Sequence, residues 1–126
     1  MSEKNKKLVT AALVIIGNEV LSGRTQDLNL NFLGKELNKI GIRMTEARTV
    51  PDIETDIVDT INALRSKYDY VFSTGGIGPT HDDITSACVA KAFGLGHGRH
   101  PEAEAMLLAH YKPEDVTPAR MKMSET

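Results

Sequence analysis

The chain has 126 residues, enough for one domain with a real core but near the lower limit for a complete three-layer α/β fold. Its 15 lysines and arginines nearly balance its 17 aspartates and glutamates, and the net charge of −2 gives no bulk attraction to nucleic acid. The single cysteine, Cys88, excludes an internal disulfide, and residues 1–8 lack the pattern of a signal peptide or membrane span. We expect a cytoplasmic protein that binds a small molecule, with no nucleic acid and no membrane as partner.

The segment from Leu8 to Ile16 is a nearly continuous apolar run. Such a run fits a strand that is covered on both faces of a parallel sheet, so we predict that it is the central strand. After it, Asp27 can cap a helix that Gly41 can end. The apolar positions of this helix recur at three- and four-residue steps, at Leu30, Leu33, Leu37 and Ile40.

A second strand is predicted from Ile42 to Val50, and the charged side chains interspersed in it place it near a sheet edge. Pro51 and Asp52 then open a helix. The apolar face of that helix consists of Ile53, Ile57, Ile61 and Leu64.

The third strand is predicted from Tyr70 to Ser73 and leads into a glycine-rich turn. A short helix follows from Asp83, with Cys88 on its buried face as a small hydrophobe, and residues 94–98 must form a loop. Pro101 fits the first turn of another helix, for which we predict a buried stripe of Ala103, Met106, Leu107 and His110.

Strand and helix patterns alternate along the chain, which implies right-handed crossovers between parallel strands. We therefore predict an α/β fold, a three-layer α/β/α sandwich with a mainly parallel, Rossmann-like, doubly wound sheet. Residues 1–7 form a polar N-terminal tail and residues 8–126 form one domain. In such a sheet, ligands bind at the carboxyl ends of the strands.

Residues 74–85 are the most informative segment, because a glycine-rich turn follows a strand directly and precedes two aspartates. Glycines allow positive φ angles and leave backbone N–H groups uncovered, while the next helix directs the positive end of its dipole to the same place. A phosphate is favoured there. Asp82 and Asp83 beside a phosphate site suggest a divalent cation, a proton-transfer role or simple helix capping.

Other polar residues gather at the same predicted edge, but several have simpler explanations. Asp27, Asp52 and Asp83, each taken alone, are most simply explained as helix caps. His97, His100 and Glu102 are better explained as a solvated loop than as a metal site. Two candidate phosphate contacts remain at this edge, His81 and Arg24.

Several motifs in order resemble the molybdopterin-binding, or molybdenum cofactor biosynthesis, domain. They are Gly17-x-Glu19, Leu21-x-Gly23, Asp27-x-Asn29, Pro51-Asp52, the run Thr74-Gly-Gly-Ile-Gly-Pro-Thr80, and Asp82-Asp83-x-Thr85. The likeness runs from about Leu8 to Phe93 and is closest to the amino-terminal domain of the competence-damage-inducible family and the equivalent domain of FAD synthases. Neither G-x-G-x-x-G nor the Walker phosphate loop is present, which argues against ordinary dinucleotide or ATP-hydrolysis sites.

The resemblance implies that the glycine turn holds the phosphate end of molybdopterin, another pterin or a nucleotide. Asp52 and Asp83 match an acidic pair regarded as important in the relatives, so we assign them as catalytic, and Asp82 with Asp83 as the site of a divalent metal such as Mg²⁺. The ligand-binding residues implied are Gly17, Glu19, Gly23, Asp27, Thr74, Gly75, Gly76, Gly78, Thr80, Asp82 and Thr85.

Three functions are compatible with this resemblance. The first is a domain that binds a phosphorylated pterin or nucleotide and is linked to molybdenum cofactor metabolism. The second is a metal-dependent nucleotide pyrophosphatase of the ADP-ribose or FAD type, in which Asp52, Asp82 and Asp83 hold the cation or activate water. The third is a non-catalytic subunit or regulatory remnant that keeps the fold.

The chain departs from the family pattern in two respects. Asn18 stands where many relatives have an aspartate, which removes a possible metal contact or alters the hydrogen bonds of the loop. The family's domain also continues past the point matching Met123, so the chain is expected to be incomplete at its C-terminal end. We therefore expect the sheet edge to be covered in a homo-oligomer or by further strands of a longer polypeptide.

Overall fold

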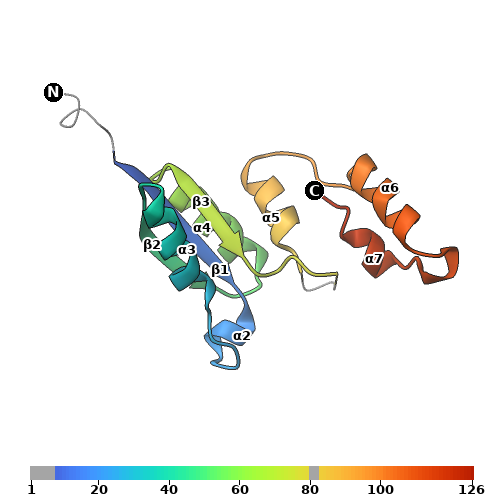
Figure 1. The fold of residues 1–126 in the computed structure, drawn as a ribbon, viewed down its shortest axis with the longest axis horizontal. Helices are drawn as coiled ribbons and strands as arrows, with labels where there is room; N and C mark the ends of the chain where they lie inside the picture. The colour runs from blue at the N-terminus through green and yellow to red at the C-terminus, as the bar shows by residue number, and fades with distance from the viewer. Residues whose placement is uncertain (1–7, 80–82) are drawn as a thin grey trace.

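The computed structural model describes residues 8–79 and 83–126 and contains a three-stranded parallel sheet in the order β2-β1-β3 (Figure 1). The strands are β1 (Val9–Ile16), β2 (Ile42–Val50) and β3 (Tyr70–Thr74). The prediction of a central first strand is confirmed, since β1 pairs with both neighbours. Each of the three predicted strands is present within a residue of its expected bounds.

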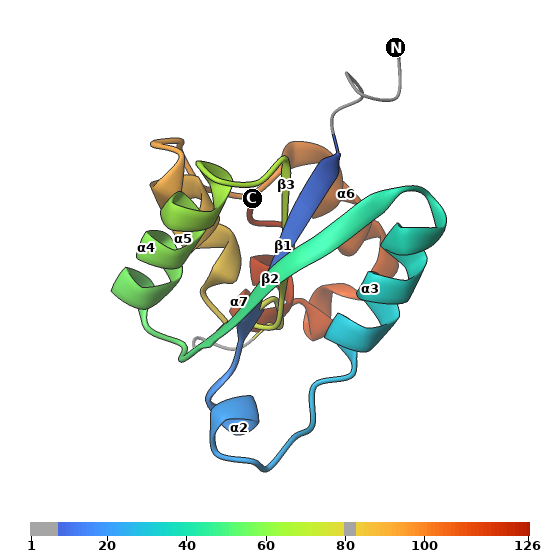
Figure 2. The same ribbon diagram turned by 90° about the vertical axis from the view of Figure 1, so that its left-hand side faces the viewer.

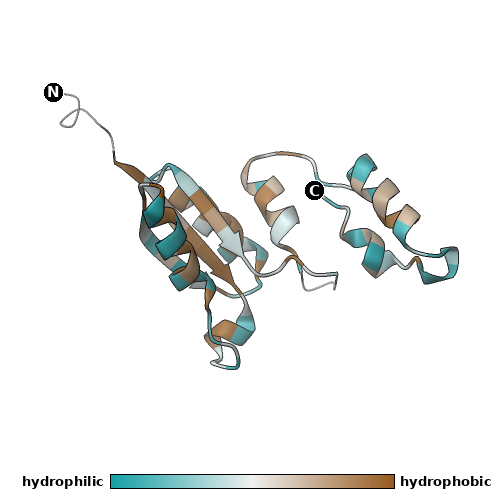
Figure 3. Ribbon diagram, viewed as in Figure 1, coloured by the Kyte–Doolittle hydropathy of each residue, from teal (hydrophilic) through white to brown (hydrophobic). Residues whose placement is uncertain are grey.

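Burial explains why β1 lies in the centre. All residues from Ala11 to Ile16 are at most 6% exposed, so apolar side chains are needed on both faces. The outer strand β2 instead alternates between exposed and partly buried residues over most of its length, as an edge strand does. Figure 3 shows the same contrast as a continuous hydrophobic β1 beside more mixed elements.

The register brings the carboxyl ends of the strands together. Ile16 lies opposite Val50, and Ile15 lies opposite Thr74. A shift in the β1–β2 register between Ala11 and Ala12 precedes this alignment. The loops that follow all three strands therefore leave the sheet at one edge, where parallel α/β folds bind ligands.

Helices cover both faces of the sheet (Figure 2), with α3 (Asn29–Lys39) on one face and α4 (Glu54–Arg65) and α5 (Thr85–Ala92) on the other. The core on the α4 side is a continuous cluster of buried residues. The strand β1 and the helices α4 and α5 contribute Ala12, Val14, Ile16, Ile57, Ile61, Leu64, Cys88 and Ala92 to this cluster. The predicted three-layer α/β architecture and the buried position of Cys88 are confirmed, and burial raises the pKa of the Cys88 thiol.

The start of α3 agrees with the expected cap. The Asp27 carboxylate accepts hydrogen bonds from the backbone N–H groups of Asn29 at 3.2 Å and Leu30 at 3.0 Å. The apolar face of α3 is only thinly covered, because Leu37 is its one buried residue. Leu30 remains 38% exposed.

The predicted start of the next helix, at Pro51 and Asp52, is wrong by two to three residues. Helix α4 begins at Glu54 after the extended residue Ile53, and Asp52 does not cap it. The physical reason is that the Asp52 carboxylate binds the loop after β1 instead.

The C-terminal region contains α6 (Pro101–His110), the short 3₁₀ helix η1 (Pro113–Asp115) and α7 (Pro118–Lys122), which lie beyond α5 on the side away from the sheet (Figure 1). The predicted buried stripe of Ala103, Met106, Leu107 and His110 is wrong, since no residue of α6 is buried and Met106 is 73% exposed. Apolar spacing alone buries nothing when no element packs on that side.

Helix α7 has no counterpart among the elements predicted from the sequence. The Thr117 hydroxyl accepts a hydrogen bond from Arg120 N at 3.2 Å and caps the helix. Met121 of α7 is 3% exposed and Ser124 is fully buried.

Residues 98–100 pair with residues 124–126 in an antiparallel arrangement. Gly98 N donates to Thr126 O at 2.9 Å, and Thr126 N donates back to Gly98 O at 2.7 Å. Arg99 and Glu125 form an isolated bridge between them. The loop after α5 is therefore held in place by residues that follow it by more than 20 positions. In the described part of the chain, no helix combines the length and apolar character needed to cross a bilayer.

Candidate ligand-binding site

The glycine turn after β3 adopts a conformation that only glycine fits. Gly75 and Gly76 have φ angles of 87° and 66°, in the left-handed region. A Cβ atom on Gly75 would lie 2.0 Å from the carbonyl oxygen of Ile16, and one on Gly76 would lie 2.2 Å from Thr85 Oγ1. The turn thus packs directly against the end of β1 and the start of α5.

Thr85 fixes the shape of this turn. Its hydroxyl donates to Gly75 O at 2.8 Å, and its backbone N–H donates to Gly76 O at 3.1 Å. Because Thr85 is 2% exposed, water cannot readily replace these bonds. The backbone N–H groups of residues 75–78 donate to no acceptor within the described residues, 8–79 and 83–126. These N–H groups remain available for an anion.

Thr74 adds an unusual feature at the end of β3. Its hydroxyl oxygen is buried and has no hydrogen-bond partner among the described residues. A buried hydroxyl without a partner costs free energy unless a water or a ligand satisfies it. The hydroxyl therefore marks the same edge of the sheet as the glycine turn.

Asp52 and Asn18 join the loops after β2 and β1. Asn18 N donates to Asp52 Oδ2 at 3.2 Å, and Asp52 N donates to Asn18 Oδ1 at 3.3 Å. Gly17 N adds a bond to Val50 O at 3.0 Å. Asn18 therefore supplies the same side-chain acceptor that an aspartate would, and it places no second carboxylate beside Asp52.

Asp83 does not cap the helix that follows it. The N-cap position of α5 is Ile84, and no side chain makes a capping hydrogen bond there. Instead, a Cβ atom on Gly78 would lie 2.6 Å from Asp83 Oδ2, so Gly78 leaves the space in which this carboxylate lies. The Lys122 ammonium donates to the backbone oxygen of Asp83 at 2.5 Å, which brings α7 against the turn.

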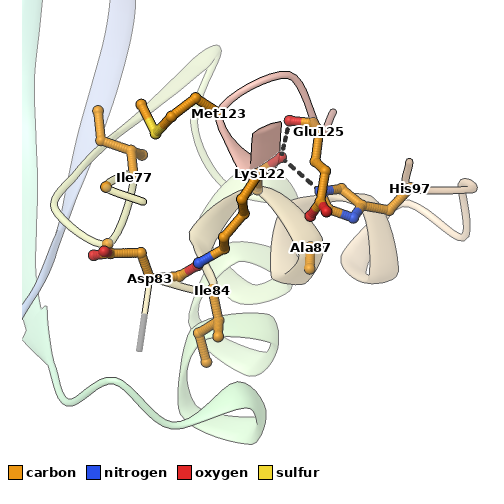
Figure 4. A pocket seen from close by; sticks show the side chains of 11 residues that line it. Ile77, Asp83, Ile84, Ala87, His97, Lys122, Met123 and Glu125 are labelled. Atoms are coloured by element: carbon orange, nitrogen blue, oxygen red, sulfur yellow. Dashed lines mark hydrogen bonds between the residues drawn. The ribbon is translucent and has the colours of Figure 1, made fainter. Parts of the chain in front are cut away.

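Two cavities flank the glycine turn. The first, of about 330 Å³, we call the upstream cavity; its polar lining residues are Glu19, Thr25, Gln26, Asp27, Asn29 and Thr74, with Gly75 from the turn. The second, of about 370 Å³, we call the downstream cavity (Figure 4). It is lined by Gly76, Ile77, Gly78, Asp83, Ile84, Ser86, Ala87, His97, Lys122, Met123 and Glu125.

The structure brings most of the predicted ligand-binding residues to this edge. Four of them line the upstream cavity: Glu19, Asp27, Thr74 and Gly75. Two line the downstream cavity, Gly76 and Gly78, together with Asp83 from the predicted catalytic pair. Gly17 makes room for the Glu19 side chain, and Thr85 supports the turn.

The remaining predicted residues do not meet there. Gly23 has a φ angle of 81° in the loop after α2 (Asn18–Leu21) and lines neither cavity. The Arg24 side chain donates to Ser22 Oγ at 3.3 Å and lines neither cavity. Thr80, His81 and Asp82 lie outside the described residues, so the metal site assigned to Asp82 and Asp83 stays a prediction. Within residues 8–79 and 83–126, no three His, Cys, Asp or Glu side chains gather as a metal-binding group.

Sequence reasoning missed four polar residues of the downstream cavity: Ser86, His97, Lys122 and Glu125. His97 was assigned to a solvated loop, yet its Nε2 lies 3.0 Å from Ser86 Oγ. The pairing of residues 98–100 with 124–126 brings these groups to α5. No local pattern in the sequence predicts that pairing.

The chain matches a protein-family model and several known proteins. A family model described as "Probable molybdopterin binding domain" matches residues 12–126. "Protein TV0584" of Thermoplasma volcanium is 39% identical over 114 residues, which are 90% of this chain and 44% of that protein. "Probable FAD synthase" of Caenorhabditis briggsae is 45% identical over 84 residues, which are 67% of this chain and 16% of that protein. The chain therefore spans less than half the length of these two relatives.

A solved structure shares the fold closely. It is described as the protein CinA with unknown function from Thermoplasma acidophilum, and it is 34% identical with a TM-score of 0.85. The match covers 92% of this chain and 69% of that chain. The agreement extends beyond the sheet to nearly the whole chain.

Proposed function

The chain belongs to the molybdopterin-binding domain family, and from this membership we propose that it binds a phosphorylated pterin or nucleotide with the phosphate on the glycine turn. The observation that carries the proposal is the set of backbone N–H groups of residues 75–78, which bind no acceptor among the described residues. They lie at the carboxyl edge of the sheet between two cavities. On this proposal the domain acts in molybdenum cofactor metabolism.

The turn is suited to an anion because it is rigid before a ligand arrives. Gly75 and Gly76 are held by the two hydrogen bonds from Thr85, so little ordering entropy is lost on binding. Helix α5 begins at Thr85, which is hydrogen-bonded to the turn, so the positive end of its dipole lies beside the turn. The buried Thr74 hydroxyl offers a further donor that a phosphate oxygen can satisfy.

Asp52 and Asp83 have different roles in this proposal. Asp52 is bound to Asn18, so its carboxylate orients the loop after β1 and holds one wall of the site. Asp83 lies against Gly78 at the turn and lines the downstream cavity. A carboxylate beside a phosphate either accepts a proton or shares a cation with it, and Asp83 is our candidate for that chemistry.

Hydrolysis of a nucleotide pyrophosphate is the second candidate. It is favoured by the relative described as "Probable FAD synthase", which is 45% identical over 84 residues. This candidate requires a divalent cation such as Mg²⁺ between Asp83 and Asp82, in addition to the phosphate site. A third candidate, a non-catalytic subunit, requires the phosphate site alone.

Isothermal titration calorimetry with molybdopterin, AMP, ADP-ribose and FAD, each with and without Mg²⁺, tests the proposal. We expect micromolar binding of at least one compound by the parent protein and at least about a tenfold loss in Gly76→Ala, because the new Cβ meets Thr85 and the φ angle is strained. Gly96→Ala is the matched control, since a Cβ atom there meets nothing within 4 Å.

Three results separate the hydrolytic candidate from the two candidates that only bind a ligand. Binding of none of the four compounds rejects the proposed function. Binding together with release of AMP from ADP-ribose only in the presence of Mg²⁺ establishes the hydrolytic candidate. Binding without turnover under any of these conditions favours the binding domain or the non-catalytic subunit.

A further inference from the structure

The downstream cavity has an apolar side that is not explained by folding. Ile77 is 68% exposed and Met123 is 50% exposed, although both are large hydrophobic residues. Both line the cavity, together with Ile84 and Ala87. Figure 4 shows Ile77 and Met123 on the side of the view away from His97 and Glu125. Apolar side chains left open in a cavity are available to a ligand.

The polar side of the cavity is organised by Ser86. Its hydroxyl lies 3.0 Å from His97 Nε2 and donates to the backbone oxygen of Glu125 at 3.4 Å (Figure 4). A serine hydroxyl has one proton, so donation to Glu125 O requires His97 Nε2–H to be the donor to Ser86. In the tautomer with the proton on Nε2, Nδ1 is a hydrogen-bond acceptor.

The cavity begins at the phosphate-binding turn itself. Gly76 and Gly78 form part of its lining, so a phosphate on the turn places the adjoining part of the ligand at its entrance. Its volume of about 370 Å³ lies at the low end of ligand pockets, which span about 300–1,000 Å³. This space suits one ring system of a ligand better than a whole dinucleotide.

The upstream cavity is less suited to an aromatic ring. It carries two carboxylates, Glu19 and Asp27, and its lining residues include no cation. Its polar groups suit the hydroxyls of a sugar or a linker. The downstream cavity combines exposed apolar side chains with a histidine and a lysine.

We infer that the downstream cavity is the subsite for the planar nitrogen heterocycle of the ligand, with Ile77 and Met123 against the ring face and the Ser86–His97 pair at the ring edge. The inference rests on the proposed function, because the phosphate on the glycine turn positions the ring. Ile and Met side chains pack against flat rings, and methionine sulfur contacts with aromatic rings are favourable. Ring nitrogens with attached hydrogens supply the donors that His97 Nδ1 accepts.

The test compares phosphates with and without a ring. Neopterin monophosphate and AMP carry a nitrogen heterocycle, and ribose 5-phosphate carries none. We expect the parent to bind at least one of the first two about tenfold or more tightly than ribose 5-phosphate. Met123→Ala is expected to weaken the ring-bearing ligand about fivefold and leave ribose 5-phosphate unchanged. Met106→Ala is the matched control, since Met106 lies on α6 and does not line the cavity.

A second measurement uses only the parent protein, so it still tests the subsite if Met123→Ala fails to fold. In the parent protein, nuclear Overhauser contacts are expected between the ring protons of the bound ligand and the methyl groups of Met123 and Ile77. Equal affinity for all three phosphates, or ring contacts elsewhere, overturns the subsite while leaving the phosphate site intact. Absence of binding by every phosphate overturns the proposed function and the subsite with it.

Discussion

Replacing Thr85 by valine tests how the glycine turn is held. Valine keeps the shape of threonine and removes only the hydroxyl, which donates to Gly75 O at 2.8 Å. The residue is 2% exposed, so the Gly75 carbonyl loses a partner that water cannot easily replace. A net hydrogen bond contributes about 0.5–1.5 kcal/mol, and a buried acceptor left unsatisfied costs about 1–3 kcal/mol. We expect the free energy of unfolding to fall by about 1–3 kcal/mol.

Urea denaturation measures this loss, and Thr85→Ser is the matched control because it keeps the hydroxyl and removes the methyl group. Serine is expected to lose about 0.5–1.5 kcal/mol, the usual cost of one buried methyl. Calorimetry with AMP should show weaker binding for valine than for serine, since only valine loosens the turn. A valine variant as stable as the parent, or one with unchanged affinity, would refute the assigned role of Thr85 in ordering the phosphate site.

Four further predictions concern Gly75, Asp83, Cys88 and the outer edge of β3. Gly75→Ala is expected to lose about 1–2 kcal/mol more stability than Gly41→Ala, because both have φ angles above 80° but only at Gly75 would a Cβ atom collide with backbone, at 2.0 Å; equal losses in urea denaturation contradict this. Asp83→Asn is expected to abolish any nucleotide hydrolysis, because the amide can neither accept the proton nor share the cation, whereas retained turnover in an active protein rejects a catalytic role. Burial raises the pKa of the Cys88 thiol, so its reaction with a disulfide reagent at pH 8 should require unfolding; rapid reaction of the native protein contradicts its buried position. The outer edge of β3 pairs with no strand in the described part of the chain and carries no charged residue, so self-association through it is expected in light scattering and should be abolished by Ser73→Lys, since Ser73 is exposed; association that survives this change contradicts the prediction.

The motif-bearing parts of this protein could be predicted from the sequence because their physics is local. The apolar run of β1 needs cover on both faces, and the structure places it between β2 and β3. Asp27 caps α3 through amides two and three residues away. The glycine turn could be predicted because the positive φ angles of Gly75 and Gly76 favour glycine over every other residue.

The predictions that are wrong concern features that depend on residues far away in the sequence. The apolar spacing of α6 predicted a buried stripe, yet Met106 is exposed because none of the described elements packs over it. Asp52 follows a proline where a helix cap is common, but its carboxylate binds Asn18, 34 residues earlier. A local pattern describes which face an element can bury, and it does not say whether a partner is present.

The sequence alone determined the parallel α/β architecture, the need for glycine in the turn after β3 and the order of the loops around that turn, because periodicity and backbone restrictions act over a few residues. The tertiary structure decided which side chains complete the site. His97 reaches Ser86, and Lys122 reaches Asp83, only because residues 98–100 pair with residues 124–126 and carry both segments back to α5. Such pairings depend on the free energy of the whole packed chain, which no single segment of the sequence contains.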